Sequence, residues 1–264
     1  MSATQSPKGS SADSLTGAEL VNPYDNNRQK SEQVEEMFDS IAPAYDFMNT
    51  AMTFGLHRYW RNRALSAATR KLRSGSPLSV IDIATGTGDV AFNLHRRFTA
   101  ATIKGVDLSE GMLEVARKKL ATMSDDAQRS ISFERGDSLD LKFADSAFDL
   151  VTVAYGVRNF QYLDRGLAEM ARVLKPGGVL CIIELSEPVG TVTKPLYKLY
   201  SQRIIPAIGR MVSGDSRAYS YLPESIAAAP QRDRMAAMIR RAGFADCRWK
   251  SLTFGAVTYY IATK

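Results

Sequence analysis

Five apolar segments of strand length recur through the middle of the chain, with amphipathic segments between them. The apolar segments are residues 78–83, 102–106, 131–134, 148–153 and 179–184. Between them, apolar positions recur at helical spacing up to about 98, from 110 to 120 and from 163 to 174. This alternation predicts right-handed crossovers and a parallel sheet with helices on both faces.

The two flanks of this core have different patterns. Residues 31–41 repeat apolar positions at helical spacing, with Ser31 as the expected N-cap, and an aromatic-rich break precedes a helical segment at 57–72. After a long apolar and basic segment at 193–212, a helix is expected at 231–242. Residues 244–252 and 253–262 then resemble two strands of a terminal antiparallel hairpin. The predicted class is α/β, with a mostly parallel sheet of seven strands.

Length and composition fit one soluble α/β domain. The chain has 264 residues, of which 45% are hydrophobic and 23% charged. No apolar run approaches the length of a membrane-spanning helix, and no secretory signal is visible, so a cytoplasmic location is expected. Two cysteines and two histidines leave little material for a disulfide framework or a metal site. The net charge of +6 suits nucleic acid, an anionic membrane surface or an ordinary solvated surface.

Composition also suggests a domain organisation. Residues 1–30 are poor in large aliphatic side chains, so a disordered tail is expected. The remainder, 31–264, is expected to form one domain with four parts. These are an N-terminal helical lid (31–75), a cofactor-binding core (76–190), a substrate or lid insertion (191–230) and the terminal helix and hairpin (231–264).

A glycine-rich turn after the first strand is the strongest local motif. Gly86 and Gly88 let the backbone approach a ligand at a helix N-terminus, and Asp107 ends the next strand. The pattern suits the ribose of a nicotinamide dinucleotide or of S-adenosylmethionine. Asp82 and Asp89 flank the glycines, and carboxylates there favour a ligand with an ammonium and a sulfonium over a pyrophosphate. Asp137 and Ser138 follow the third strand and extend the acidic edge.

Four longer segments resemble a known family. The segments at 38–49, 54–60, 155–159 and 215–225 are similar to those of the quinone-biosynthesis C-methyltransferases of the UbiE/MenG type, within the class I S-adenosylmethionine-dependent methyltransferases. The resemblance covers about residues 31–264 and implies a Rossmann-like fold. It also implies that Thr87, Asp107, Asp137 and Ser138, together with the two glycines, contact S-adenosylmethionine.

The implied reaction is methyl transfer to a ring carbon of a polyprenylated quinol. Arg158 is the candidate for stabilising a ring phenolate, and Tyr45 is the candidate for shaping the lid over cofactor and quinol. Asn49 is expected to bond a quinol oxygen or to cap a helix, and His57 to contact the quinol or to be structural. No metal is required.

The expected function is therefore conversion of demethylmenaquinol to menaquinol. A benzoquinol methyltransferase of the ubiquinone pathway and an NAD-dependent oxidoreductase remain alternatives. A non-catalytic lipid- or RNA-binding module is the third, although no RNA-recognition signature appears. The helical stripe in 193–212 suggests peripheral contact with the inner face of a membrane, and a homodimer is left open.

Overall fold

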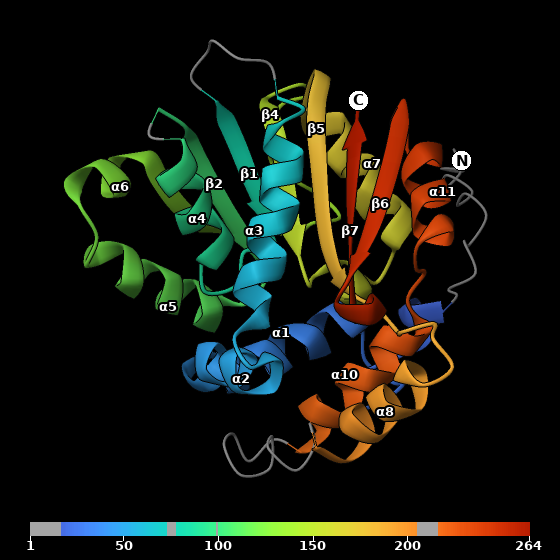
Figure 1. Cartoon of the computed structure of the whole chain (residues 1–264). Coiled ribbons are helices and arrows are strands. Elements are labelled where there is room, and N and C mark those ends of the chain that lie inside the picture. Colours follow the sequence, from blue (N-terminus) through green and yellow to red (C-terminus); the bar gives the residue numbers. More distant parts are fainter. Residues whose placement is uncertain (1–16, 73–77, 99, 205–215) are drawn as a thin grey trace, which may run out of the picture.

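A mixed sheet of seven strands organises the protein (Figure 1). The computed structural model describes residues 17–72, 78–98, 100–204 and 216–264. In spatial order the strands are β3-β2-β1-β4-β5-β7-β6, and the first five are parallel while β7 pairs antiparallel with both β5 and β6. Their bounds are β1 Ser79–Ile83, β2 Thr102–Asp107, β3 Ile131–Arg135, β4 Phe148–Ala154, β5 Leu174–Leu185, β6 Asp246–Leu252 and β7 Val257–Thr263. The predicted fold class is confirmed.

Helices cover both faces of this sheet because its strands are apolar on both sides. One face packs against α3 (Leu56–Thr69), α4 (Asp89–Arg97) and α5 (Glu110–Ala121), with Leu65, Leu94 and Leu113 fully buried. The other face packs against α7 (Leu163–Val173) and α11 (Asp233–Arg241), through Leu167 and Ile239. A short helix, α6 (Asp125–Ser130), precedes β3 and was not predicted.

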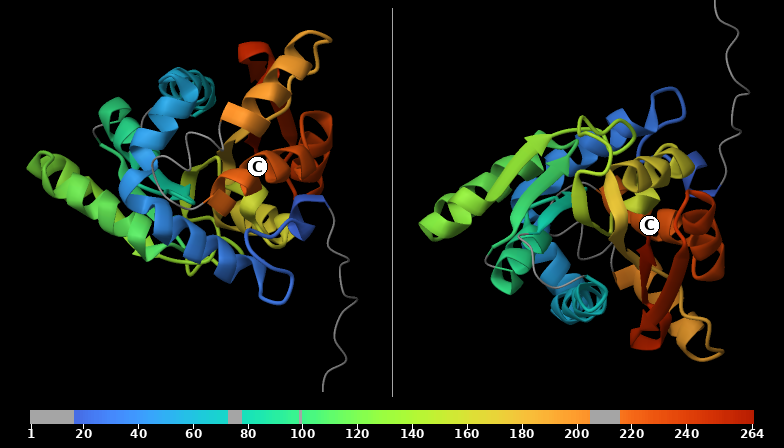
Figure 2. Two further views of the ribbon diagram at one scale, coloured as in Figure 1. Left: turned by 90° about the horizontal axis from the view of Figure 1, so that it is seen from below. Right: turned by 90° about the horizontal axis from the view of Figure 1, so that it is seen from above.

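A third group of helices lies across the carboxyl ends of the parallel strands (Figure 1; Figure 2, left). These are α1 (Lys30–Ile41), α2 (Tyr45–Thr53), α8 (Thr193–Leu199) and α10 (Ser216–Ala228). Short turns η2 (Ala42–Ala44), η3 (Val157–Asn159) and η4 (Tyr200–Ile204) connect or support them. Ligands of parallel α/β sheets bind at this edge, so the helices roof the place where a site is expected.

The N-terminal boundary of the fold differs from the sequence prediction. Residues 17–30 were expected to be part of a disordered tail, but they pack on the domain through η1 (Gly17–Leu20). The Glu19 carboxylate accepts from the Leu163 amide at 2.8 Å, and Ala18 is buried. Polar contacts to the backbone, which hydropathy does not reveal, hold this segment.

Two local predictions around the roof also need correction. Ser31 lies inside α1, whose N-cap is Gln29, and most of the aromatic-rich break expected before the helical segment at 57–72, residues 43–49, belongs to the helix α2. Helix α10 was not predicted, and residues 205–212 of the expected basic helix lie outside the described residues. Among the residues described, no helix is long and apolar enough to cross a bilayer.

Candidate functional site

Two adjoining cavities open at the carboxyl edge of the sheet. The smaller one lies over the ends of β1, β2 and β4 and under α1 and α2. Four predicted cofactor residues line it, namely Gly86, Asp107, Asp137 and Ser138. The larger cavity, of about 540 Å³, lies between α2, α8, α10 and the β6–β7 turn. Phe38, Tyr45 and Tyr155 line both cavities and form the partition between them.

The glycine turn shapes the smaller cavity through its backbone. Gly86 has φ +55°, and a Cβ there would meet only the Tyr45 ring at 3.9 Å, so the turn faces open space. Gly88 has φ +83°, and a Cβ there would lie 2.7 Å from the Phe133 ring. Gly88 does not line the cavity, and its lack of a side chain is required by packing under the turn.

Asp107 joins the glycine turn to the second strand. Its two carboxylate oxygens accept from the Gly86 amide at 2.8 Å and the Ser109 amide at 3.0 Å. Burial raises the pKa of Asp107 to about 6, although these amide hydrogen bonds oppose the shift. The carboxylate is therefore ionised at neutral pH and forms the acidic wall of the cavity.

The other two acidic residues beside the glycines have structural roles. Asp82 accepts hydrogen bonds from Thr85 at 2.6 Å and Thr152 at 2.5 Å, and burial raises its pKa to about 7. Asp89 forms ion pairs with Arg61 and Lys119, each at 3.0 Å. Neither lines the cavity, so the expectation that they repel a pyrophosphate from it is not borne out.

Thr87 also lies outside both cavities, in a network that fastens the roof to the glycine turn. Its hydroxyl donates to the Asp46 carboxylate of α2 at 2.6 Å and accepts from Lys119 of α5 at 3.1 Å. Lys119 also pairs with Asp46 at 2.7 Å. Thr87 thus acts on the site through the position of α2.

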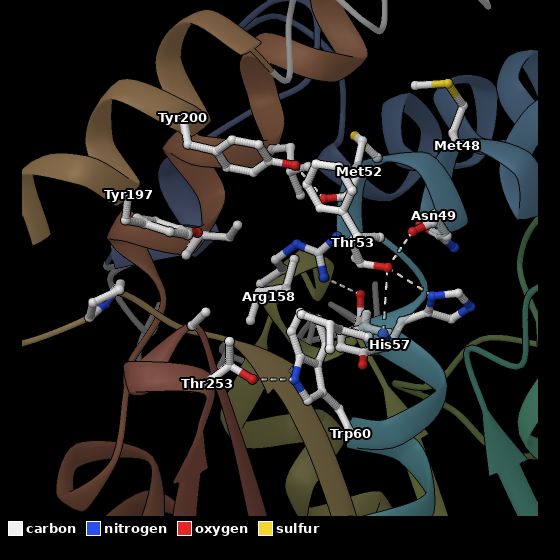
Figure 3. Close-up of a pocket in the computed structure, with 18 of the residues that line it drawn as sticks. Met48, Asn49, Met52, Thr53, His57, Trp60, Arg158, Tyr197, Tyr200 and Thr253 are labelled. Carbon is white, nitrogen blue, oxygen red and sulfur yellow. Dashed lines mark hydrogen bonds between the residues drawn. The ribbon is translucent and has the colours of Figure 1, made fainter. Parts of the chain in front are cut away.

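Apolar and aromatic side chains dominate the larger cavity (Figure 3). Met48 and Met52 come from α2, Trp60 from α3, and Tyr197 and Tyr200 from α8 and η4. The Tyr200 hydroxyl donates to the Met52 carbonyl, which joins η4 to α2 at the cavity. Such a lining suits a large apolar ligand with few polar groups.

Arg158 provides the buried charge of this cavity. Its Nη1 lies 2.8 Å from Glu184 Oε1, and its backbone amide donates to Glu184 Oε2 at 3.2 Å. Burial disfavours the charged form of Arg158, but the attraction of Glu184 outweighs it and the pKa of Arg158 is raised. The guanidinium therefore stays charged while its Nε has no hydrogen-bond partner in the structure.

Tyr155 presents a second unsatisfied polar atom at the partition. Its hydroxyl is buried without a hydrogen-bond partner, and its backbone has φ 61°. Burial raises the pKa of Tyr155, so the hydroxyl stays protonated. A buried polar atom without a partner costs free energy, and both Tyr155 and Arg158 belong to the lining of the larger cavity.

Two predicted residues of α2, Tyr45 and Asn49, lie where the two cavities meet the roof. Tyr45 lines both cavities, and Asn49 lines the larger one. Burial raises the pKa of Tyr45, although a side-chain hydrogen bond with Asn49 opposes the shift. The two side chains therefore support each other within one turn of helix.

His57 has a contact that favours its structural interpretation. Thr53 Oγ1 donates to the Asn49 carbonyl at 2.6 Å, so it must accept from His57 Nδ1, which lies 2.8 Å away. Burial and the nearby charge of Arg61 lower the pKa of His57, so the ring is neutral at pH 7. It borders the larger cavity, but in Figure 3 Thr53 stands between it and Arg158.

Sequence reasoning missed three residues that organise the site. Glu184 is the only charged residue of the apolar segment 179–184 and lies at the carboxyl end of β5, which is a signal that could have identified it. Tyr155 lies in the segment 155–159, which resembles the family, but the sequence analysis assigned no function to its side chain. Lys30 gave no signal, because its contacts to the Ala18 and Arg158 carbonyls join segments far apart in sequence.

The chain is similar to known methyltransferases along most of its length. The sequence pattern that defines the ubiE/COQ5 methyltransferase family matches residues 26–264. A demethylmenaquinone methyltransferase of Bacteroides fragilis is 45% identical over 93% of this chain and 98% of its own length. One of Deinococcus radiodurans is 42% identical over 94% and 99%. A ubiquinone/menaquinone biosynthesis C-methyltransferase UbiE of Geotalea daltonii is 39% identical over 89% and 98%.

Solved structures share the fold at lower identity. A SAM-dependent methyltransferase of Thermotoga maritima matches with a TM-score of 0.57 and 20% identity, over 87% of this chain and 99% of its own. Phosphoethanolamine N-methyltransferase 2 of Haemonchus contortus, solved with S-adenosyl-L-methionine, matches with a TM-score of 0.57 and 16% identity, over 77% and 52%. At these identities the likeness concerns the fold alone.

Proposed function

Because the chain belongs to the ubiE/COQ5 methyltransferase family, we propose that it transfers a methyl group from S-adenosylmethionine to a ring carbon of a polyprenylated quinol. The observation that carries this proposal is the pair of adjoining cavities. An acidic cavity at the glycine turn meets a large apolar cavity at Phe38, Tyr45 and Tyr155. Two ligands of different polarity can therefore meet at one point.

The smaller cavity fits S-adenosylmethionine by its donor and acceptor set. Asp107 is an acceptor suited to ribose hydroxyls, and Asp137 and Ser138 suit polar groups of the adenosine. When bound, S-adenosylmethionine supplies an electrophilic methyl group on a positively charged sulfur. The Gly86 turn leaves open space beside Tyr45, so backbone and ligand can approach closely.

The larger cavity fits a quinol with an apolar tail. Two of the residues that line it, Arg158 and Tyr155, have a polar atom without a hydrogen-bond partner, whereas Met48 and Met52 contribute apolar side chains to its wall (Figure 3). A ring oxygen at the partition would place the ring carbons next to the smaller cavity. The prenyl tail would then occupy the apolar part.

Arg158 supplies the electrostatic element of the reaction. A ring carbon becomes nucleophilic when the adjacent hydroxyl gives its proton to solvent water, because the phenolate pushes electron density into the ring. The carbon that gains the methyl group then loses its own proton to solvent, which restores the aromatic ring. The charged guanidinium stabilises that phenolate and lowers the pKa of the hydroxyl. Glu184 holds the guanidinium in place, and the neutral Tyr155 hydroxyl can donate to the same oxygen.

Demethylmenaquinol is the preferred ring. Two of the relatives compared above are named demethylmenaquinone methyltransferases and are 45% and 42% identical, whereas the UbiE relative is 39% identical. A benzoquinol of the ubiquinone pathway remains the second candidate. A nicotinamide-dependent oxidoreductase loses its support, because the glycine fingerprint is accounted for by the methyltransferase family.

The test is methyl incorporation by the purified protein. We expect label from methyl-labelled S-adenosylmethionine to enter reduced short-chain demethylmenaquinone, with a product one methyl heavier by mass spectrometry. Reduced demethylated benzoquinone, assayed in parallel, decides between the two rings. Failure to label either quinol, or oxidation of NADH by the quinone, would contradict the proposal.

The location follows from the substrate. A polyprenyl tail is insoluble in water, so the quinol resides in a membrane, and we expect the protein to work in the cytoplasm at the inner membrane face.

A further inference from the structure

Several exposed apolar side chains gather at the mouth of the larger cavity. Among the described residues, five large apolar side chains are both well exposed and part of its lining, namely Phe54, Leu56, Leu196, Leu199 and Phe254. We refer to these five as the rim. Val189 and Val192 are also exposed and lie on the segment that leads into α8. An apolar patch of this kind marks an interaction surface.

Two rim residues are highly exposed and also have an unfavourable backbone conformation. Phe54, at the end of α2, has φ 50° and is 82% exposed, and Phe254, in the β6–β7 turn, has φ 56° and is 80% exposed. Phenylalanine rarely adopts positive φ, so ordinary turn chemistry would place Asn or Gly at both positions. Large apolar residues that stay in strained and solvated positions indicate a role outside the isolated fold.

Two side-chain hydrogen bonds hold the turn that carries Phe254. Trp60 Nε1 donates to Thr253 Oγ1 at 2.7 Å, and Ser186 Oγ donates to the Gly255 carbonyl at 2.7 Å. Trp60 is buried at the cavity wall, so the contact fixes the turn to α3. Phe254 is thus presented on a rigid support.

Three of the elements that line the larger cavity carry charge of one sign. Helices α3 and α8 and the turn η4 contain no Asp or Glu, and their exposed charged side chains include Arg58, Lys194 and Arg203. Basic side chains beside exposed aromatic and aliphatic ones are typical of proteins that dock on anionic bilayers.

We propose that the rim inserts into the surface of an anionic lipid bilayer, so that the larger cavity opens directly into the membrane. The apolar surface of the rim is continuous with the cavity lining, and a bilayer would cover both without a break. A long apolar ligand could then pass from lipid to cavity without contacting water. This proposal rests on the proposed function for the identity of that ligand, but not for the docking itself.

The experiment is vesicle flotation of the full-length protein without cofactor or quinol. We expect wild type to float with mixed phosphatidylcholine and phosphatidylglycerol vesicles and less with phosphatidylcholine alone. The double variant Phe54→Asn/Phe254→Asn should bind about tenfold or more weakly, because two inserted rings are lost. Asn tolerates positive φ, so its melting temperature should be equal to or above that of wild type.

Two further variants sharpen the comparison. Lys194→Glu should weaken binding to the anionic vesicles by about fivefold or more, because it removes an attraction and adds a repulsion. Tyr162→Asn removes an exposed aromatic residue next to α7, on the other side of the sheet from α3, and should float as wild type does.

The proposal is overturned if wild type does not float, or if the double variant floats as wild type does. Self-association that the double variant abolishes, without flotation of wild type, would instead assign the rim to a second copy of this chain. Because no methyl transfer is measured, these outcomes are independent of the labelling assay.

Discussion

Asp107 and Arg158 place opposite charges on the two sides of one partition, and each can be tested alone. The Asp107 carboxylate lines the smaller cavity, which we propose for the cofactor, and the Arg158 guanidinium lines the larger one, which we propose for the quinol. Substitutions should therefore separate cofactor affinity from turnover.

Asp107→Asn should weaken S-adenosylmethionine binding by about 1–3 kcal/mol, the usual effect of losing a charged hydrogen bond. Because burial raises the pKa of Asp107 to about 6, wild-type affinity should be constant above that pH and fall as the pH drops below it. The variant has no carboxylate to protonate and should lack this fall. Calorimetric titration across the acidic range measures both effects, and identical pH profiles would exclude Asp107 from binding.

Arg158→Lys should lower kcat by about 100-fold or more while leaving cofactor affinity nearly unchanged. Lysine keeps the charge but lacks the fork that reaches both Glu184 and a ring oxygen. Arg172→Lys, at a surface ion pair with Glu169, is the matched control and should retain wild-type kcat. Equal losses in the two variants would argue against a role for Arg158 in the chemistry.

For single residues, the sequence predicted the location of the site residues better than it predicted their contacts. Gly86, Asp107, Asp137 and Ser138 meet in one cavity because they follow parallel strands, whose carboxyl ends share an edge. Thr87 and Asp89 follow β1, as Gly86 does, but their side chains bind Lys119 of α5 instead of lining the cavity. A local sequence pattern does not reveal a partner such as Lys119, which is about 30 residues away along the chain.

Among the elements, α1 is the one that links the N-terminal segment to the site. Lys30 begins it, and its buried ammonium donates to the Arg158 carbonyl at 3.2 Å and to the Ala18 carbonyl. The backbone of the turn that bears Arg158 is thereby held by Lys30 as well as by Glu184.

Lys30→Met should lower kcat and leave cofactor affinity unchanged, because it frees the backbone of Arg158. Burial, and then repulsion from Arg158, lower the pKa of Lys30 to about 8, below its unfolded value near 10.5. The unfolded state therefore binds more protons between these values, and the free energy of unfolding should rise with pH across that window in wild type. Denaturant unfolding at successive pH values should show no such rise in the variant.

The elements of the roof were harder to predict than those of the core. Core strands and helices bury one continuous apolar face, so periodicity identifies them. Helix α2 exposes Phe47, turns Tyr45 into a cavity and has only nine residues, and α10 contains Pro223, a residue that sequence reasoning takes as a helix breaker.

For the whole molecule, cofactor binding should appear as thermal stabilisation. S-adenosylmethionine at 100 times its dissociation constant should add about 2.7 kcal/mol to the free energy of unfolding and raise the melting temperature accordingly. NADH at the same concentration should produce no shift. A shift with NADH alone would restore the oxidoreductase interpretation.

One helix, α2, contributes Tyr45 to the wall between the two compartments and roofs both of them. The larger compartment has a mouth of its own at the rim, but a displacement of α2 would open both compartments at once. Asp46 on the same helix is anchored to Thr87 and Lys119, so that displacement must break those polar contacts. Release of the spent donor from the smaller compartment should therefore wait on that slow conformational step, whereas the methylated ring should leave through the mouth.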